Sequence, residues 1–351
     1  MEFLPETTIV ALIGLGGGLV LGLAARLGRF CTMGAIEDLL YAQSDLRMRM
    51  WGMAIGSAIL GTFILSQTGL LNIGQTFYFS VTWMPLASIL GGLAFGYGMA
   101  MAGNCAFGSI ARLGGGDMRA FVIVLVMGVS AYAVLSGPFA FLRIYVFPHI
   151  EPTTEIPQGI AHAIGYYTGI SANYVGIAIG AAIVAFMVSS AEFRAKPSSI
   201  LWGAMVGLAI VSGWAGTQWV ANTGFEDLPV VSHSYSAPLG EAILYTMTAS
   251  GRSLSFAVGS VVGVLVGSFL GSLIKGHFRW EACEDPRELR RQIFGAMLMG
   301  GGAVVALGCT IGQGITAFSV LAYSAPVTFA AIFAGAALGL RHLIAGFQPA
   351  E

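Results

Sequence analysis

The sequence predicts an all-α polytopic membrane protein, with about nine transmembrane helices in an inverted repeat and short re-entrant helices between them. Three observations support this prediction: too little charge for a soluble surface, nine apolar stretches, and a repeated glycine–cysteine motif. Of the 351 residues, 56% are hydrophobic and 9% are charged, whereas soluble domains carry about 25% charged residues. The 50 glycines fit as well, because small residues let membrane helices approach closely.

The composition also narrows the function. A formal net charge of -1 and the absence of a basic patch give no support for binding nucleic acid. Residues 1–8 contain Glu2 and Glu6 but no Lys or Arg, so the positive region of a secretory signal peptide is missing. We therefore expect the first apolar stretch to stay in the lipid membrane as a helix.

Nine stretches are candidate membrane helices, because a spanning helix needs about 20 predominantly apolar residues. Several are short, and the third and eighth run into glycine-rich segments that need not cross fully. The nine candidates lie near residues 8–26, 50–67, 83–102, 119–136, 173–190, 198–216, 253–274, 293–308 and 325–345.

The placement of Lys and Arg tests this count, since cytoplasmic loops carry an excess of positive charge. With nine spans, every Lys and Arg except Arg143 and Arg252 falls on one side of the membrane. That side is predicted to be the cytoplasm. The chain then lies in the bacterial cytoplasmic (inner) membrane with its N-terminus outside and its C-terminus inside.

The longer connections are predicted to lie mainly outside. Prolines predict that residues 137–172 form an external loop with one short amphipathic helix, and residues 217–250 are interpreted in the same way. On the cytoplasmic side, Asp285 followed by Pro286 predicts an N-cap and a first-turn proline at the start of a basic helix.

An internal repeat links two distant glycine-rich stretches. Residues 91–108, GGLAFGYGMAMAGNCAFG, and 295–312, GAMLMGGGAVVALGCTIG, match without a gap at glycine, alanine and cysteine positions. The third predicted helix runs inward and the eighth outward, so the repeats are inverted, as in many transporters. We therefore divide the chain into a first repeat (1–136), an external loop with a linking transmembrane helix (137–197) and a second repeat (198–351).

Three of the four cysteines are followed three residues later by a glycine. The pairs are Cys31–Gly34, Cys105–Gly108 and Cys309–Gly312. The fourth, Cys283, lies in a charged cytoplasmic segment without the glycine. A single membrane cysteine is usually a small apolar packing residue, but two at equivalent repeat positions and a third in the same pattern favour a functional set.

A short apolar segment follows each of these cysteines, and we interpret it as a short helix, re-entrant in at least two cases. Helix N-termini offer unpaired N–H groups and a positive dipole end, which suit an anion. A buried thiol far from cations stays protonated, and its weak S–H donor can bind a sulfur anion briefly and release it. The glycines would let the chain turn sharply and approach the solute.

Other polar residues near the motifs have two possible roles. Asn104 and Gln313 could donate amide hydrogen bonds to the anion, or they could cap helices, and Thr32 and Thr310 lie close by in the sequence. We expect four charged residues to form ion pairs at the cytoplasmic interface rather than line the path: Glu37, Asp38, Arg112 and Asp117.

No cofactor or metal site is predicted. The cysteines lack paired spacing or a nearby histidine to complete a zinc site, and the histidines are expected to be exposed or interfacial. They are His149, His162, His233, His277 and His342. The methionines near the motifs are interpreted as packing residues, although they leave a soft-metal route for copper(I) open.

Three segments resemble the cysteine-bearing motifs of the YeeE/YedE family of sulfur transporters. They are RFCTMGAIEDLL (29–40), GMAMAGNCAFGSIARLG (98–114) and LMGGGAVVALGCTIGQGITAFSVLA (298–322), of which GCTIGQG is the most specific part. The resemblance spans nearly the whole chain and implies a nine-span inverted repeat whose re-entrant helices meet at an hourglass centre. It also implies thiosulfate uptake past three cysteines, with a small cytoplasmic TusA-like sulfurtransferase as a possible partner.

One departure from this pattern concerns the second half of the chain. The best counterpart of the Cys31 motif is SAPLGEAILY (236–245), which places Ala237 near the cysteine position. The predicted path is therefore asymmetric, with a thiol on the cytoplasmic side and none opposite.

These observations predict a non-enzymatic transporter that takes up thiosulfate or a closely related inorganic sulfur anion. Cys105 and Cys309 would flank a central constriction and Cys31 would lie toward the cytoplasmic exit. The predicted substrate-binding residues are Cys31, Cys105, Cys309, Gly108, Gly312, Asn104 and Gln313. Two alternatives stay open: a membrane sulfurtransferase that forms a cysteine persulfide, for which no adjacent His or Lys is evident, and a transporter of soft metals or selenium compounds.

Overall fold

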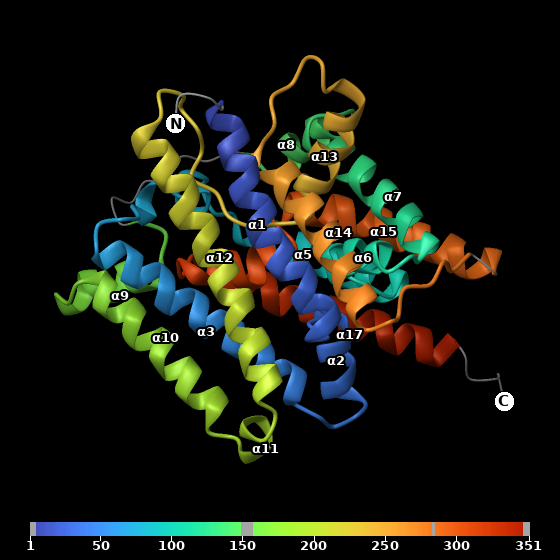
Figure 1. Ribbon diagram of the computed structural model, residues 1–351, viewed down its shortest axis with the longest axis horizontal. Helices are drawn as coiled ribbons and strands as arrows, with labels where there is room; N and C mark the ends of the chain where they lie inside the picture. The colour runs from blue at the N-terminus through green and yellow to red at the C-terminus, as the bar shows by residue number, and fades with distance from the viewer. Residues whose placement is uncertain (1–4, 149–156, 283–284, 347–351) are drawn as a thin grey trace.

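The computed structural model describes residues 5–148, 157–282 and 285–346, and these residues are predominantly helical (Figure 1). Seven helical segments are long and apolar enough to cross a membrane. They are Glu6–Leu40, Leu46–Gln67, Pro85–Gly114, Met118–Leu135, Pro197–Thr223, Phe256–Ile274 and Ser324–Ala345. The prediction of an all-α polytopic membrane protein is confirmed.

A helix occupies each of the nine predicted stretches, but two of these helices fall outside the spanning set. Helix α10, Ala172–Val188, is apolar but has only 17 residues. Helix α15, Pro286–Val305, carries Arg287, Glu288, Arg290 and Arg291 at its start, so only its later part is apolar. The count of nine spans therefore stays a prediction.

The long helices alternate with shorter ones. Besides α10 and α15, the long helices are α1 Glu6–Leu27, α3 Leu46–Gln67, α5 Pro85–Ala102, α7 Met118–Leu135, α12 Pro197–Thr223, α14 Phe256–Ile274 and α17 Ser324–Gly346. The short ones are α2 Thr32–Leu40, α4 Phe77–Ser80, α6 Ala106–Gly114, α8 Ala140–Val146, α9 Ile160–Thr168, α11 Ala191–Arg194, α13 Ala237–Thr248 and α16 Ala317–Ser319. A 3₁₀ turn, η1, covers Ile73–Gln75, and a π-helical segment, η2, covers Gly312–Thr316.

Glycine brings the central helices into backbone contact. Helices α1 and α14 pack side by side (Figure 1). A methyl group added at Gly259 would meet the carbonyl oxygen of Ala11, and one added at Gly263 would meet that of Leu15. The high glycine content therefore serves close helix packing, as the composition predicts.

The packing partners are reciprocal between the two halves of the chain. Helix α1 packs on α14 and α12 packs on α3, while α5 packs on α17 and α15 packs on α7. In addition, α5 contacts α15 and α1 contacts α12. Two halves related by a twofold axis would produce this pattern, and the inverted repeat itself stays a prediction.

Two predicted loops are more helical than expected. The described part of 137–172 holds two short helices, α8 and α9, instead of one. In the 217–250 region, α12 continues to Thr223 and α13 begins at Ala237, which leaves 224–236 as the irregular part. The end of α12 was predicted too early because it contains polar residues. One of them, Gln218, is buried, and its amide forms hydrogen bonds with Gln75, Asn72 and Asn222.

The predicted start of the basic helix is confirmed. Asp285 is the N-cap of α15, and its carboxylate accepts a hydrogen bond of 2.8 Å from the backbone N–H of Arg287. Pro286 occupies the first turn, where its missing N–H costs nothing.

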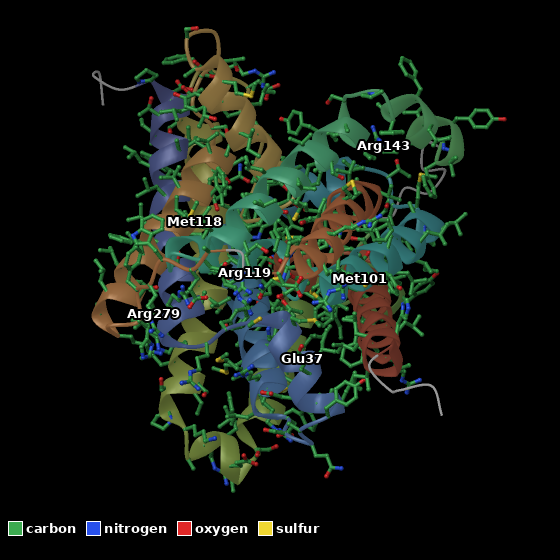
Figure 2. All side chains as sticks on the ribbon, turned by 90° about the vertical axis from the view of Figure 1, so that its right-hand side faces the viewer. Glu37, Met101, Met118, Arg119, Arg143 and Arg279 are labelled. Atoms are coloured by element: carbon green, nitrogen blue, oxygen red, sulfur yellow. The ribbon has the colours of Figure 1, made fainter. Side chains whose placement is uncertain are left out.

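The labelled charges lie unevenly along the molecule. Figure 2 shows Arg143 near one end, away from Arg119, Arg279 and Glu37. Arg119 contacts the carboxylates of Asp117, Glu281 and Glu288 at 3.3, 3.6 and 3.8 Å. The predicted sidedness of Lys and Arg in the membrane stays a prediction.

Candidate functional site

Each of the three motif cysteines precedes a short helix and caps its N-terminus. The sulfur atoms of Cys31, Cys105 and Cys309 accept hydrogen bonds from the backbone N–H three residues later, at 3.5, 3.3 and 3.5 Å. The donors are the glycines of the three C-x-x-G motifs. These glycines lie inside the first helical turn, so of the glycines flanking the cysteines they are not the ones that turn the chain sharply.

The sharp turn occurs two residues before each cysteine. Arg29, Gly103 and Leu307 all adopt left-handed backbone conformations, with φ of 55°, 76° and 57°. Such a residue ends a helix and redirects the chain. The same turn therefore separates α1 from α2, α5 from α6, and α15 from the helical segment 310–319. This is the break that the predicted re-entrant helices require.

Cys105 and Cys309 are buried and bonded to other parts of the chain. Both side chains are 0% exposed. Thr32, on α2, donates to the Cys105 sulfur at 3.9 Å. The backbone N–H of Tyr235, in the 224–236 segment, donates to the Cys309 sulfur at 3.3 Å. These contacts join the short helices around the thiols.

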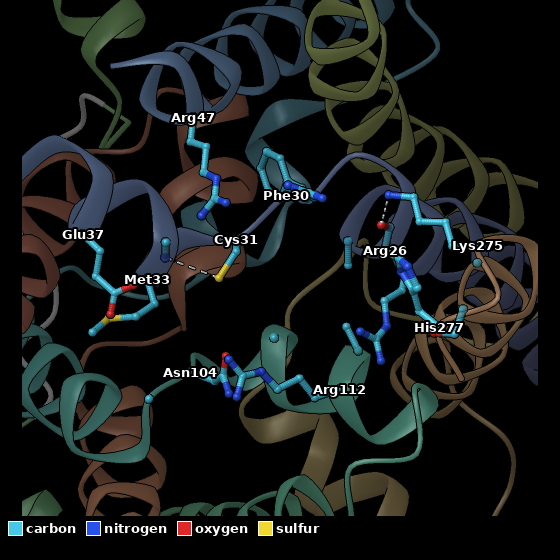
Figure 3. A pocket seen from close by; sticks show the side chains of 18 residues that line it. Arg26, Phe30, Cys31, Met33, Glu37, Arg47, Asn104, Arg112, Lys275 and His277 are labelled. Atoms are coloured by element: carbon cyan, nitrogen blue, oxygen red, sulfur yellow. Dashed lines mark hydrogen bonds between the residues drawn. The ribbon is translucent and has the colours of Figure 1, made fainter. Parts of the chain in front are cut away.

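Cys31 lines a cavity of about 400 Å³, which we call the cationic cavity. It gathers the C-terminal ends of α1, α5 and α14 with the short helices α2 and α6. Five of its lining residues are Arg or Lys and one is acidic. Figure 3 shows Arg47 and Cys31 facing Asn104 and Arg112, with Arg26, Lys275 and His277 along another side.

Most of these cations have no carboxylate partner among the described residues. Arg47 pairs with Asp38 at 3.1 Å, but Arg26, Arg29 and Arg112 make no ion pair within 4.0 Å in that part of the chain. Lys275 donates to the carbonyl oxygens of Arg26 and Leu27, at the end of α1. Burial lowers the pKa of Lys275, and the charges of Arg29 and Arg26 lower it further.

The expectation about interfacial ion pairs is right for two residues and wrong for two. Asp38 pairs with Arg47 and Asp117 with Arg119. Glu37 and Arg112 instead line the cationic cavity with Cys31. Their spacing could have predicted this, because Glu37 follows Gly34 by three residues and Arg112 follows Gly108 by four, and such residues share a helix face.

A second cavity, of about 190 Å³, lies at the C-terminal end of α7, where Leu135 lines it. Its other lining residues include Tyr78, Ser234, Ser236 and Gly308. Residues next to each buried thiol line a different cavity: Asn104, before Cys105, lines the cationic cavity, and Gly308, before Cys309, lines the second one.

Hydroxyl groups line the second cavity where the cationic cavity has a thiol. Ser236, and not Ala237, is the N-cap of α13. Ser234 lies 3.9 Å from the Cys309 sulfur, and the Tyr78 hydroxyl donates to the Gly312 carbonyl at 2.7 Å. Cys31 lines the cationic cavity rather than facing lipid. This position is compatible with the predicted asymmetry, in which a thiol lies on the cytoplasmic side of the path and none lies opposite.

The two predicted amides differ. Gln313 donates to the carbonyls of Ala306 and Leu307, both at 3.0 Å, so its N–H groups hold the end of α15. Asn104 is 3% exposed and its side chain has no hydrogen-bond partner among the described residues. Because it lines the cationic cavity, Asn104 has donors available for a ligand.

Of the histidines in the described residues, His277 and His342 are exposed and His162 is half-buried, whereas His233 departs from the expectation. His233 is fully buried, and its Nδ1 atom lies 2.7 Å from the Ser260 hydroxyl. His277 lines the cationic cavity, and the His342 ring bonds the hydroxyl of Tyr97. Burial lowers the pKa of His162. His149 and Cys283 lie outside the described residues.

The described residues contain no group of three or more His, Cys, Asp or Glu side chains that could hold a metal ion. What the site offers is a set of donors: helix N-termini, thiols, an amide and guanidinium groups. The sequence predicts that these Arg residues lie on one side of the membrane, but no local pattern indicates that their guanidinium groups form a cluster. Donors of this kind bind anions.

Comparisons with known proteins identify the family and two relatives of this chain. The family model for sulphur transport matches residues 27–338. The thiosulfate transporter TsuA of Spirochaeta thermophila is 26% identical over 322 residues, which cover 89% of this chain and 92% of that protein. The thiosulfate transporter TsuA of Escherichia coli strain K12 is 24% identical over 325 residues, which cover 89% of this chain and 88% of that protein.

Proposed function

The chain belongs to the sulphur transport family, and on this premise we propose that it carries thiosulfate, or a closely related inorganic sulfur anion, into the cytoplasm. The relatives named thiosulfate transporter support this substrate class. The single observation that supports the path is the position of the thiols. Cys31 lines the cationic cavity, and the buried Cys105 and Cys309 each follow a residue that lines one of the two cavities, Asn104 and Gly308.

In this proposal the anion passes the thiols one after another. It enters from the second cavity beside Ser234 and Gly308, passes Cys309 and Cys105, and leaves through the cationic cavity beside Cys31. Each sulfur already accepts an N–H bond, so its S–H hydrogen points elsewhere and is available to an anion. A weak S–H donor suits conduction, because a bound ion must also leave.

The other predicted site residues support the thiols in different ways. Asn104 and Gly108 line the cationic cavity and contact the anion as it leaves Cys105. Gly312 and Gln313 hold the turn that carries Cys309, through the N–H bond of Gly312 to the sulfur and the Gln313 amide bonds to α15. We assign Gln313 a positioning role.

We propose that the cationic cavity faces the cytoplasm of the inner membrane. Positive charge accumulates on the cytoplasmic side of membrane proteins, and five of the lining residues are Arg or Lys. The N-terminus is then outside and the C-terminus inside. A small cytoplasmic TusA-like sulfurtransferase could receive the anion at this cavity.

Growth tests the proposal. A bacterium without its own importers of thiosulfate and sulfate should grow on thiosulfate as sole sulfur source when it expresses this protein. An empty vector and a strain supplied with cysteine serve as controls for expression and viability. If the protein reaches the membrane and growth on thiosulfate still fails, the proposed substrate is wrong.

A membrane sulfurtransferase is the second candidate, because Cys31 is a thiol at a cavity whose cations attract thiosulfate. The Cys31 sulfur would attack the outer sulfur of thiosulfate, form a persulfide and release sulfite. Intact-protein mass spectrometry after thiosulfate exposure distinguishes the two candidates. A gain of one sulfur atom that the Cys31→Ser variant lacks would favour the enzyme.

A further inference from the structure

We propose that the cationic cavity is an anion-binding site in its own right, which selects divalent tetrahedral oxyanions by charge rather than by sulfur chemistry. The thiols of Cys105 and Cys309 would select anions that contain a terminal sulfur atom, whereas this cavity would bind any divalent oxyanion that reaches it. Its role in transport rests on the proposed function, but its binding of oxyanions does not.

Charge is the first support. Five cations and one carboxylate, that of Glu37, line the cavity. Arg26, Arg29 and Arg112 have no carboxylate within 4.0 Å among the described residues, so their charge is not neutralised by neighbouring ion pairs. Guanidinium groups present parallel N–H donors that match the oxygens of a tetrahedral anion.

Unused hydrogen bonds are the second, independent support. Asn104 is 3% exposed and lines the cavity, yet its amide has no hydrogen-bond partner within the described part of the chain. The Nε atom of Arg26 is also buried without a partner. This Arg26 atom would normally find a partner, because leaving a buried polar group unpaired costs about 1–3 kcal/mol, while the Asn104 amide borders the cavity and is open to a ligand. An oxyanion between these groups would supply the missing acceptors.

Two glycines leave room for two of the guanidinium groups that line the cationic cavity. A methyl group at Gly34 would collide with the guanidinium of Arg47, and one at Gly115 would collide with that of Arg26. The cavity volume of about 400 Å³ leaves room for water beside an oxyanion, since a water molecule takes about 30 Å³. The anion is therefore held with water and can exchange with the cytoplasm.

Two consequences follow for transport. A cationic chamber lowers the energy of a dianion that has just passed the thiols, so it favours inward release. The same chamber accepts sulfate and phosphate from the cytoplasm, because its donors recognise oxygen. Abundant oxyanions inside the cell would then slow uptake by occupying the exit.

Lipid headgroups carry the same phosphate chemistry, so the test must separate the two sources. A free oxyanion is favoured because Asn104, the residue before the buried Cys105, is 3% exposed, whereas Lys275 and His277 on another side of the cavity (Figure 3) are exposed. The probe is therefore radiolabelled sulfate on the purified full-length protein in detergent, with phosphatidylglycerol as the competing headgroup.

Equilibrium dialysis measures the binding. Wild-type protein should bind sulfate saturably, with phosphate and thiosulfate as competitors, and Arg112→Gln should weaken affinity about tenfold. Arg112→Lys, which keeps the charge, should lose less. Arg252→Gln, which lies away from the cavity, and Cys309→Ala should bind as wild type. Size-exclusion elution and thermal unfolding verify that each variant is folded.

Three outcomes would overturn the inference: no saturable sulfate binding, equal binding by folded Arg112→Gln, or displacement of sulfate by phosphatidylglycerol alone. Sulfate binding in a protein that fails to support growth on thiosulfate would leave this site standing and remove the proposed transport function. Growth on thiosulfate without sulfate binding would support the proposed transport function and rule out this anion-binding site.

Discussion

At the scale of single residues, each motif cysteine has a structural and a chemical role. Its sulfur caps a short helix by accepting the N–H of the glycine three residues later. Its S–H group is the proposed contact for the anion. The pattern C-x-x-G therefore encodes a capped thiol, and replacing cysteine by alanine or by serine separates the two roles.

Cys105 tests this separation. Cys105→Ser keeps an N-cap oxygen, while Cys105→Ala removes the cap and should lower stability by about 1 kcal/mol. Both should abolish thiosulfate uptake, because neither has a thiol. Uptake and thermal unfolding in detergent measure the two effects. Full uptake by the serine variant would show that capping alone matters.

Two motif glycines should respond differently to a methyl group. A Cβ at Gly312 would approach the Ser234 hydroxyl to 2.6 Å and the Tyr78 hydroxyl to 3.2 Å. A Cβ at Gly108 would meet only ordinary contacts of 3.5 Å or more. Gly312→Ala should therefore destabilise the protein by about 1–3 kcal/mol, and Gly108→Ala should not. Equal melting temperatures for the two variants would contradict this packing.

Sequence patterns predict the three thiols as a set but not the turns before them. Gly103 is a familiar left-handed residue, whereas Arg29 and Leu307 adopt the same conformation without being glycine. The side chains of Arg29 and Leu307 do not predict this conformation, because packing against the rest of the protein holds the backbone there. The turning role expected of the flanking glycines is therefore confirmed for Gly103 and taken by Arg29 and Leu307 before the other two cysteines.

At the scale of helices, close packing depends on which glycine faces a neighbour. Gly263 of α14 lies against the backbone of Leu15 and Gly18 in α1, whereas Gly16 of α1 has nothing within 4 Å of an added methyl group. Sequence analysis predicts glycine-mediated packing in general. It does not tell which glycines carry it, because the register between two helices far apart in the chain is not encoded locally.

The pair Gly263 and Gly16 makes this testable. Gly263→Ala should destabilise the protein, because backbone atoms cannot move away from the new methyl group. Gly16→Ala should be neutral or stabilising by up to about 1 kcal/mol, since alanine has the higher helix propensity. Thermal unfolding of both variants in detergent measures the difference. A Gly263→Ala variant as stable as Gly16→Ala would refute the described contact.

The irregular segment 224–236 shows where pattern-based prediction ends. It was expected to be part of an external loop, yet His233 and Tyr235 are fully buried. The ring of His233, the hydroxyl of Tyr235 and Ser260 form a hydrogen-bonded group. A polar segment reads as a loop in the sequence, and only tertiary partners such as Ser260 reveal that it is packed inside.

At the scale of the whole molecule, the fold brings Arg and Lys residues from distant parts of the chain together around one cavity, which no local sequence pattern predicts. Residues from α1, α2, α6 and α14, and hence from both halves of the chain, line the cationic cavity. Their placement on one side follows from the distribution of Lys and Arg. Their convergence on Cys31 follows only from the fold.

This charge bears on the energetics of uptake. Moving a divalent anion inward against 100 mV costs about 4.6 kcal/mol. A cationic chamber at the exit offsets part of this cost locally, while net accumulation still needs a gradient, consumption inside or a coupled ion. We expect uptake to slow as the membrane potential rises and to quicken when it is collapsed, which valinomycin titration in potassium-loaded proteoliposomes measures. Faster uptake at high potential would instead indicate a coupled cation.

The orientation of the chain is open to a labelling experiment. In a Cys283→Ala background, a membrane-impermeant maleimide should label Cys31 in inside-out vesicles but not in right-side-out ones. Cys105 and Cys309 are 0% exposed and should stay unlabelled from both sides. Labelling of Cys31 from outside would reverse the proposed topology.

The central claim is that sulfur anions pass the buried thiols, and uptake of radiolabelled thiosulfate into proteoliposomes tests it most directly. Wild type, Cys309→Ala, Cys309→Ser and Cys283→Ala should be compared at equal reconstitution. The thiol path predicts uptake by wild type and Cys283→Ala and none by either Cys309 variant. Thiosulfate uptake at the wild-type rate by folded Cys309→Ala or Cys309→Ser would contradict it.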